Sequence, residues 1–278
     1  MKIAIVQMTS VIDPAANAAT LVAGIHAAAS GGAVMAFAPE MSALLDRDRA
    51  RAAPHLVSEA ASPFVATIRA AAAQAGIWVH CGSLPVREGA AGERLRNRTL
   101  IIDDQGDIRA RYDKLHMFDV DLATGESWRE SSAYAPGDAV VMVDTPVGAL
   151  GLTICYDLRF AALFDQFGAA GADVIAVPAA FTVPTGEAHW HVMLRARAID
   201  QGCFIIAAAQ CGTHEDGRAT YGHSLVVDPW GRILLDMGSV PGVGFAEIDH
   251  ALATDIRRRL PLVAHRRPLP PLTWRESE

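Results

Sequence analysis

A cysteine stands at the end of an apolar run in the stretch GLTICYDLRF, which covers residues 151–160. The run begins at Val147 and stops at Cys155, and the charged residues Asp157 and Arg159 follow. The pattern predicts a strand before the cysteine and a helix after it, and the N–H groups at a helix start favour a thiolate. The alternative is a cysteine that packs as a small apolar residue at a strand end.

Two further polar residues follow predicted strands. Glu40 ends the run AVMAFAPE, and Lys114 follows the strand around IRARYDK. Ligands of α/β proteins bind at the carboxyl ends of strands, so these side chains could meet Cys155 there. A thiol that attacks a carbonyl needs a base, which Glu40 could supply. It also needs a group that holds the oxyanion, and Lys114 and the backbone N–H of Tyr156 are the candidates.

The residue types alone leave two alternatives open. A glutamate or lysine after a strand is typical of a solvated loop, so Glu40 and Lys114 could have no role in chemistry. The thiol could also pair with a histidine as its base. Three histidines fall in predicted loops or helix starts: His116, His189 and His223. The residues by themselves do not choose between glutamate and histidine.

The composition indicates a globular chain that is long enough to bury a large core. The chain has 278 residues, of which 51% are hydrophobic and 20% charged, and its net charge of −7 argues against nucleic-acid binding. We expect neither a signal peptide in MKIAIVQMTS nor a membrane-spanning segment. The cysteines show neither a CxxC pair nor zinc-ligand spacing, so we expect reduced thiols in a cytoplasmic protein. They are Cys81, Cys155, Cys203 and Cys211.

Helices and strands are predicted to alternate, which is typical of the α/β class. The predicted helices cover residues 15–32, 62–76, 158–172 and 188–202. The predicted strands cover 2–8, 33–40, 77–86, 173–181, 203–210 and 242–249, with strand pairs in 96–114, 140–155 and 221–238. Ser62 is the expected N-cap and Gly76 the expected stop of the second helix.

No linker divides the chain, so we expect a single domain over residues 1–278 with an extended C-terminal tail from about residue 251. This tail is basic and rich in proline. Either it lies over the surface or a partner subunit, or it is partly disordered.

Three motifs in order, FAPE, YDKLHMFDVD and GLTICYDLRF, resemble those of the nitrilase (carbon–nitrogen hydrolase) superfamily. The resemblance runs from KIAIVQM to GFAEID, nearly the whole chain. It implies that Glu40 is the general base, Lys114 the oxyanion stabiliser and Cys155 the nucleophile. WRESSAYAPGD resembles the segment that carries a further glutamate of the family, so Glu130 would bond Lys114 and help to position the substrate.

The same resemblance implies a fold and a reaction. The fold is a four-layer α-β-β-α sandwich, in which two mixed sheets pack face to face and helices cover the outside. Hydrolysis of an amide C–N bond passes through a thioester on the cysteine, without a metal or an organic cofactor. Members of the family commonly form dimers, so a homodimer is expected, without a nucleic-acid or membrane partner.

The downstream half, with PAAFTVPTGEAHW and YGHSLVVDPWG, resembles the Nit branch, which holds deaminated-glutathione amidases and omega-amidases. This likeness implies that Arg159 binds a substrate carboxylate and that Thr185 assists, with Tyr156 at the oxyanion. The alternative for Arg159 is an ion pair with Asp157. The branch usually has an acid where this chain has His191. A metal site at His189 and His191 is disfavoured, because residues two apart on a helix point in different directions and a third ligand is not evident.

The resemblance therefore predicts an amidase of a small carboxylated amide, with deaminated glutathione as the first candidate. An omega-amidase that acts on 2-oxoglutaramate is the alternative within the class. Two others stay open: a non-catalytic binding member of the fold, and an acyltransferase that passes the thioester to an amine. An intact set of Glu40, Lys114 and Cys155 favours catalysis over mere binding.

Overall fold

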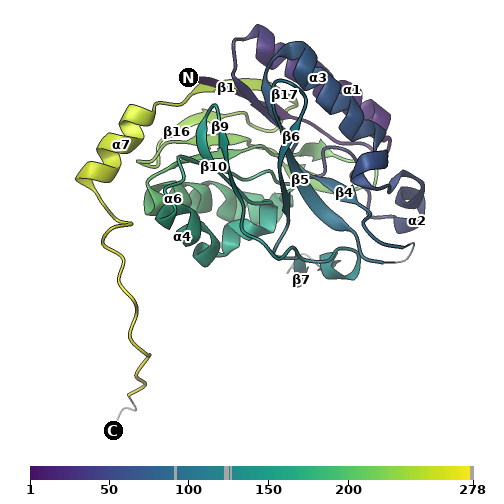
Figure 1. The fold of residues 1–278 in the computed structure, drawn as a ribbon. Helices are drawn as coiled ribbons and strands as arrows, with labels where there is room; N and C mark the ends of the chain where they lie inside the picture. Colours follow the sequence, from purple (N-terminus) through teal and green to yellow (C-terminus); the bar gives the residue numbers. More distant parts are fainter. Residues whose placement is uncertain (91–92, 122–124, 126, 276–278) are drawn as a thin grey trace.

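The computed structural model describes residues 1–90, 93–121, 125 and 127–275. Two mixed sheets form its centre (Figure 1). The strands of the first sheet are, in spatial order, β17 (Gly242–Glu247), β1 (Lys2–Gln7), β2 (Met35–Phe37), β3 (Trp78–His80), β5 (Arg96–Ile102) and β4 (Leu84–Val86), with β6 (Ile108–Asp113) also paired to β5. Those of the second sheet are β16 (Ile233–Asp236), β15 (Leu225–Val227), β12 (Phe204–Ala207), β11 (Val174–Ala176), β10 (Gly148–Leu152) and β9 (Met142–Thr145).

Each sheet has a parallel centre and antiparallel edges. In the first sheet β1, β2 and β3 run parallel, and in the second sheet β10, β11 and β12 do. Parallel neighbours need a crossover, and helices provide it on the outer faces. Two small hairpins lie outside the sheets: β7 (Asp119–Asp121) with β8 (Ser127–Arg129), and β13 (Cys211–Thr213) with β14 (Ala219–Tyr221).

Helices cover the outer faces. α1 (Pro14–Ser30) and α3 (Pro63–Ala75) lie side by side over the first sheet, while α4 (Ala161–Ala169) and α6 (His191–Gln201) lie with the second (Figure 1). The shorter helices are α2 (Arg49–Ala52), α5 (Val183–Thr185), the π-helix η5 (Gly186–Trp190), and the 3₁₀ helices η1 (Ala53–His55), η2 (Glu59–Ala61), η3 (Glu130–Ser132) and η4 (Cys155–Arg159). Together with the sheets they form the predicted four-layer α-β-β-α sandwich.

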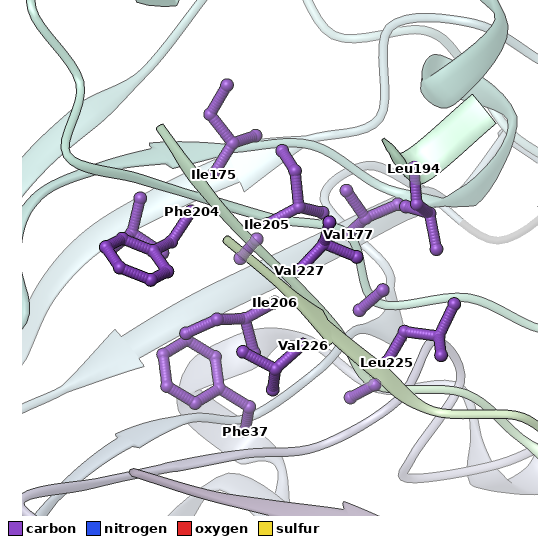
Figure 2. Close-up of a cluster of buried hydrophobic side chains, with 14 of the residues drawn as sticks. Phe37, Ile175, Val177, Leu194, Phe204, Ile205, Ile206, Leu225, Val226 and Val227 are labelled. Atoms are coloured by element: carbon purple, nitrogen blue, oxygen red, sulfur yellow. The ribbon is translucent and has the colours of Figure 1, made fainter. Parts of the chain in front are cut away.

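Apolar side chains of both sheets share one core. Phe37 of the first sheet lies among side chains of the second, including Ile206 and Val226 (Figure 2). The outer side of the second sheet packs on Leu194 of α6 in the same cluster, and Phe164 of α4 belongs to it too. Burial of apolar surface on both sides of a sheet is the main term that holds such layers together.

The local predictions for the helix at 62–76 are confirmed. Ser62 caps the N-terminus of α3 by accepting a hydrogen bond from Val65 N, and Pro63 begins the helix. Gly76 ends it with a φ of 63°, a left-handed conformation that favours glycine. The strand pairs predicted in 96–114, 140–155 and 221–238 are present as β5–β6, β9–β10 and β15–β16.

Two predicted segments differ from the structure. The helix expected from residue 158 begins at Ala161, because the preceding residues wind into the 3₁₀ helix η4. The tail expected from about residue 251 begins with a helix, α7 (His250–Arg259), which Asp249 caps through the N–H of Ala251. Beyond it the chain extends away from the body of the molecule (Figure 1). None of the helices in the described part of the chain has both the length and the apolar character that a membrane span needs.

Candidate active site

Strand ends bring three of the predicted residues to one place. Glu40 follows β2, Lys114 follows β6 directly, and Cys155 stands shortly after β10. β6 runs in the same direction as β2, because it is antiparallel to β5 and β5 is antiparallel to β3. Their carboxyl ends therefore open at the same edge of the first sheet. Cys155 comes from the second sheet across the interface.

Lys114 lies between two carboxylates. Its Nζ atom is 2.9 Å from Glu40 Oε1 and 2.9 Å from Glu130 Oε2. Lys114 is 2% exposed and Glu40 is 5% exposed, so both charges are buried. Burial lowers the pKa of Lys114, but the charges of Glu130 and Glu40 outweigh it and raise this pKa well above its ordinary value. Lys114 is therefore a fixed positive charge at this site.

Backbone N–H groups also hold the carboxylates of both glutamates in place. Ala180 N–H donates to Glu40 Oε2 at 3.0 Å, and Phe118 N–H donates to Glu130 Oε2 at 2.7 Å. Each carboxylate thus has a partner on either side, and neither can turn without losing one. The arrangement leaves Glu40 fixed beside both Lys114 and Cys155.

Asn97 is a site residue that the sequence analysis missed. It is fully buried, and its Nδ2 donates to Glu40 Oε1 at 2.9 Å and to Glu130 Oε1 at 3.3 Å. The sequence feature that could have indicated Asn97 is the alternation RNR at the start of β5. In a strand, this alternation places the asparagine on the face opposite its two charged neighbours. A single asparagine between two arginines gives no sign of which face is buried.

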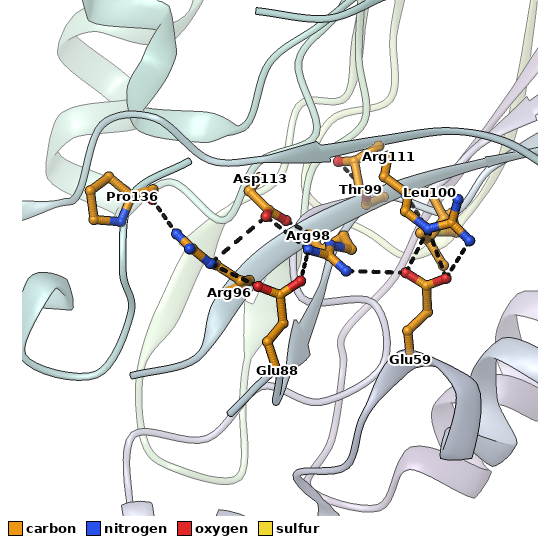
Figure 3. Close-up of polar contacts among 11 residues, drawn as sticks. Glu59, Glu88, Arg96, Arg98, Thr99, Leu100, Arg111, Asp113 and Pro136 are labelled. Carbon is orange, nitrogen blue, oxygen red and sulfur yellow. Dashed lines mark hydrogen bonds and ion pairs between the residues drawn. The ribbon is translucent and has the colours of Figure 1, made fainter. Parts of the chain in front are cut away.

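Arg96 and Arg98 enter a network of ion pairs (Figure 3). Arg98 contacts Asp113 at 2.7 Å and Glu59 at 3.3 Å. Asp113 precedes Lys114, so this network fixes the end of β6 from the outside while Asn97 fixes the carboxylates from the inside. Figure 3 also shows Arg111 reaching Glu59 from the neighbouring strand.

Cys155 has an unusual backbone and a protonated thiol. Its φ is 49°, in the left-handed region that few residues other than glycine adopt. Burial raises the pKa of the thiol well above its ordinary value, Glu40 adds to this by its charge and a hydrogen bond, and Lys114 opposes it. The expectation that a helix start favours a thiolate here is wrong. η4 is a short turn, and burial of the thiol together with the charge of Glu40 outweighs its effect on the pKa of Cys155.

Asp157 holds the turn that carries Cys155. The fully buried carboxylate accepts hydrogen bonds from Tyr112 Oη at 2.6 Å and from Ile154 N at 2.9 Å. It also accepts from His116 N at 3.0 Å. No ion pair between Asp157 and Arg159 is present among the described contacts, so that alternative for Arg159 is wrong. Asp157 instead ties the residue before the thiol to the end of β6.

The predicted residues share one cavity of about 740 Å³. Its lining includes all seven of them: Glu40, Lys114, Glu130, Cys155, Tyr156, Arg159 and Thr185. The Arg159 guanidinium carbon lies 5.7 Å from the ring centre of Tyr156 and 5.4 Å from that of Phe181. Its Nη1 is 3.2 Å from His189 Nδ1. The Thr185 hydroxyl is 2.8 Å from that of Thr182.

The three histidines considered as alternative bases have other partners. His116 Nδ1 is 2.7 Å from Asp157, His189 contacts Arg159, and His223 Nδ1 is 2.9 Å from Asp236. Glu40 is the neighbour whose charge and hydrogen bond act on the Cys155 thiol. The geometry therefore favours glutamate over histidine as the base.

The family model described as carbon-nitrogen hydrolase matches residues 2–258. The chain belongs to the carbon-nitrogen hydrolase family. A relative from Yersinia enterocolitica named deaminated glutathione amidase is 40% identical over 250 residues, which are 90% of this chain and 87% of the relative. The C. elegans NitFhit protein has 36% identity and a TM-score of 0.87 over 96% of this chain and 65% of that one.

A further solved structure bears on the cysteine. It is a glutamate-to-glutamine mutant of an amidase from Nesterenkonia sp. AN1, with 25% identity and a TM-score of 0.78 over 94% of this chain and 98% of that one. That structure shows the result of Michael addition of acrylamide at the active-site cysteine of the Nesterenkonia enzyme. As a carbon-nitrogen hydrolase, the present chain is an amidase of the nitrilase superfamily, as its sequence motifs indicated.

Proposed function

We propose that this carbon-nitrogen hydrolase cleaves the amide bond of deaminated glutathione through a thioester on Cys155. The observation that carries the proposal is the buried set of Glu40, Lys114 and Cys155 at one wall of a cavity that also holds Arg159. The name of the Yersinia enterocolitica relative supports the substrate, and the acrylamide adduct of the Nesterenkonia enzyme supports a cysteine nucleophile.

Acylation begins with the neutral thiol. Glu40 takes the thiol proton as the sulfur attacks the amide carbon, so the thiolate forms only when a substrate is present. The carbonyl oxygen becomes an oxyanion, which the Lys114 ammonium and the backbone N–H of Tyr156 stabilise. The C–N bond then breaks, Glu40 returns the proton to the leaving nitrogen, and a thioester remains on Cys155.

Deacylation uses the same groups, with water as the nucleophile and the Cys155 sulfur as the leaving group. Glu40 takes a proton from water, and the water oxygen attacks the thioester carbon. The C–S bond breaks and the proton returns to sulfur. Glu130 and Asn97 keep the reacting groups in position through both steps, since Glu130 contacts Lys114 and Asn97 contacts both glutamates. Hydrolysis of deaminated glutathione in this way yields 2-oxoglutarate and cysteinylglycine.

Arg159 and Thr185, which also line the cavity, are proposed to bind the substrate. A guanidinium binds a carboxylate through two parallel hydrogen bonds, and the rings of Tyr156 and Phe181 hold the Arg159 side chain in place. The substrate has carboxylates at both ends of its chain. The one beside the 2-oxo group is assigned to Arg159.

The test measures products over a panel of amides. Purified enzyme should release cysteinylglycine from deaminated glutathione with a higher kcat/KM than it releases ammonia from 2-oxoglutaramate. Glutathione itself, which keeps its amino group, is the matched control substrate. A Cys155→Ala variant should be inactive while retaining its far-UV circular dichroism spectrum. Turnover by this variant would contradict the nucleophile, and preference for 2-oxoglutaramate would make the protein an omega-amidase.

We also propose a homodimer in the cytoplasm. Three apolar residues of the tail, Leu269, Leu272 and Trp274, are 92%, 91% and 83% exposed. A second copy of the chain would cover these side chains in the dimer. All four cysteines are free thiols. Free thiols persist in a reducing compartment, which supports the cytoplasmic location.

A further inference from the structure

Outside the cavity lining, three side chains place their potential metal-binding atoms close to one another. His191 begins α6, His223 precedes β15, and Asp236 ends β16. His191 Nε2 is 3.1 Å from Asp236 Oδ2, and His223 Nδ1 is 2.9 Å from Asp236 Oδ1. One ligand atom from each residue lies within 4.8 Å of the others. His189, whose pairing with His191 in a metal site the sequence disfavoured, lies against Arg159 and is not part of this group.

The spacing of these atoms matches a mononuclear site. Zinc binds histidine nitrogen and carboxylate oxygen at about 2.0–2.2 Å, so neighbouring ligand atoms around one ion are roughly 3.0–3.4 Å apart. The Oδ2 atom of Asp236 lies 3.1 Å from His191 Nε2 and 3.2 Å from His223 Nδ1, and both distances fall within this range. An ion could therefore replace the two hydrogen bonds to Asp236 with little movement of the side chains.

The backbone of His223 adopts a strained conformation that presents its ring to Asp236. Its φ is 54°, and the other non-glycine residues with positive φ in the described ranges are Met41 and Cys155, both of which line the cavity. His223 N–H donates to Gly238 O at 2.6 Å, and its carbonyl accepts from Trp190 Nε1 at 2.7 Å. Such strain persists where surrounding contacts enforce it, often at functional sites.

Neighbouring groups fix the orientation of the ligands. The Tyr221 ring stacks on His223 with ring centres 4.5 Å apart, and Gly238 N–H donates to Asp236 Oδ1 at 2.9 Å. In metal sites, contacts from neighbouring groups to the ligand side chains orient those ligands toward the ion. The side chains of His191, His223 and Asp236 retain 31%, 28% and 34% exposure, which gives an ion access from solvent.

We propose that His191, His223 and Asp236 bind one divalent transition-metal ion of the zinc class, with water in its remaining positions. Two imidazoles favour zinc, cobalt, nickel or copper over magnesium and calcium. The site would join the start of α6 to the β15–β16 hairpin. Tyr221, whose ring stacks on His223, donates its backbone N–H to Phe181 O at 3.0 Å. Phe181 lines the cavity, so Tyr221 connects the proposed metal site to the cavity wall. The amide chemistry does not use the ion.

The experiment titrates Zn²⁺ into a full-length Cys155→Ala variant, because the thiol of the candidate active site would compete for zinc. Calorimetry should give one ion per chain. The midpoint of thermal unfolding should rise by about 5 °C when free zinc is ~100 times its dissociation constant. Mg²⁺ or Ca²⁺ should cause no such rise. With Co²⁺ as the probe, visible absorption bands should report nitrogen and oxygen ligands.

The decisive variant is His191→Gln in the same background, because glutamine can keep a hydrogen bond to Asp236 but is a poor zinc ligand. Zinc affinity should fall at least ~10-fold while the thermal midpoint of the zinc-free protein stays near its original value. Asp236→Asn should act likewise. His55→Ala, which removes an exposed histidine elsewhere, should bind zinc normally. The proposal is overturned if zinc does not bind, or if His191→Gln binds it as well as its parent does. In either case the three residues form only a hydrogen-bonded cluster.

Discussion

Cys155 lies in surroundings that keep its thiol protonated, and the same carboxylate that contributes to this is the proposed base. Burial, together with the charge of Glu40, raises the pKa of Cys155. A thiol of this kind is unreactive toward solvent oxidants, because the thiolate is the nucleophile. Reactivity then depends on a substrate that occupies the cavity and accepts the sulfur as the proton moves to Glu40.

Replacement of Glu40 by glutamine should separate thiol acidity from catalysis. The variant loses a negative charge beside Cys155, so the pKa of this thiol should fall and its alkylation by iodoacetamide should begin at lower pH. Hydrolysis should nevertheless decrease on the order of 100- to 10,000-fold, because the base is gone. Peptide mass spectrometry identifies the modified residue. This matters because burial raises the pKa of Cys81 and Cys203 to about 12 and leaves them unreactive.

Glu130→Gln is the matched control for this experiment. Glu130 contacts Lys114, whereas Glu40 is the carboxylate whose charge and hydrogen bond raise the pKa of Cys155, so the alkylation profile should change less. An unchanged alkylation profile in Glu40→Gln would contradict the assigned origin of the raised pKa. Unchanged hydrolysis would contradict Glu40 as the base.

Arg159 is predicted to select carboxylated substrates. Arg159→Lys keeps the charge but loses the planar pair of donors, so kcat/KM for deaminated glutathione should fall roughly 10- to 100-fold. The same amide with its carboxylates converted to methyl esters should lose much less. Steady-state kinetics of both substrates on both proteins provide the comparison. Equal losses would mean that Arg159 acts through its packing on Tyr156 and Phe181 instead.

At the scale of elements, β5 fixes the site from two sides. Arg96 and Arg98 of this strand enter the outer ion-pair network (Figure 3). Asn97, between them, contacts both carboxylates. The period of two in a strand makes this division possible. A shift of one residue in the β5–β6 register would turn Asn97 outward and bring a guanidinium into the site.

Asn97→Ala should reduce kcat much more than it changes KM, because Asn97 positions Glu40 and Glu130 without lying in the cavity lining. We expect a loss of about 10-fold or more, in line with the loss of an orienting contact at a catalytic centre. Thr99→Val is the control. Thr99 lies two residues further along the strand and donates to Gly82 O, so the change should affect thermal stability and leave kcat alone. Equal effects on kcat would assign Asn97 a general role in folding.

The sequence predicted the helices and strands better than it predicted which side chains contact one another in the fold. Ser62 and Gly76 marked the ends of α3 because capping is local chemistry between neighbouring residues. The motifs around Glu40, Lys114 and Cys155 were found through family resemblance. Asn97 could not be found this way, since its role depends on the pairing of β5 with β6. The partners of His191 lie 32 and 45 residues away in the chain, so helical spacing alone could not reveal them.

At the scale of the whole molecule, the site depends on both sheets packed against each other. Cys155 comes from the second sheet, while Glu40 and Lys114 come from the first, and core side chains such as Phe37 and Ile206 keep the two in register (Figure 2). Interiors are packed as densely as organic crystals, so the sheets have little freedom to slide. This rigidity allows two layers to hold the Cys155 thiol beside Glu40, its proposed base.

Ala253 of α7 belongs to the core, but the part of the tail beyond α7 lies outside this packing. Arg266 anchors its start, because its guanidinium lies 2.9 Å from the carboxylate of Asp165 on α4. The residues beyond it extend from the body with Leu269, Leu272 and Trp274 exposed. A chain truncated after Arg267 removes these three side chains and keeps the anchor.

If a second copy covers the tail, the truncated chain should dissociate at protein concentrations where the full chain stays dimeric. Sedimentation velocity over a dilution series should show a dimer dissociation constant at least ~10-fold higher, because three large apolar side chains each contribute about 1.5–3 kcal/mol when buried. A matched variant with Leu269, Leu272 and Trp274 replaced by serine, which keeps the length, should behave like the truncation. Hydrolysis per chain should be retained in both, since the residues of the candidate active site all precede the tail. A full chain that is monomeric would contradict the dimer itself. A truncated chain that dimerises as tightly as the full one would place the contact elsewhere, on the helical layer of α4 and α6, where Val192 is 62% exposed.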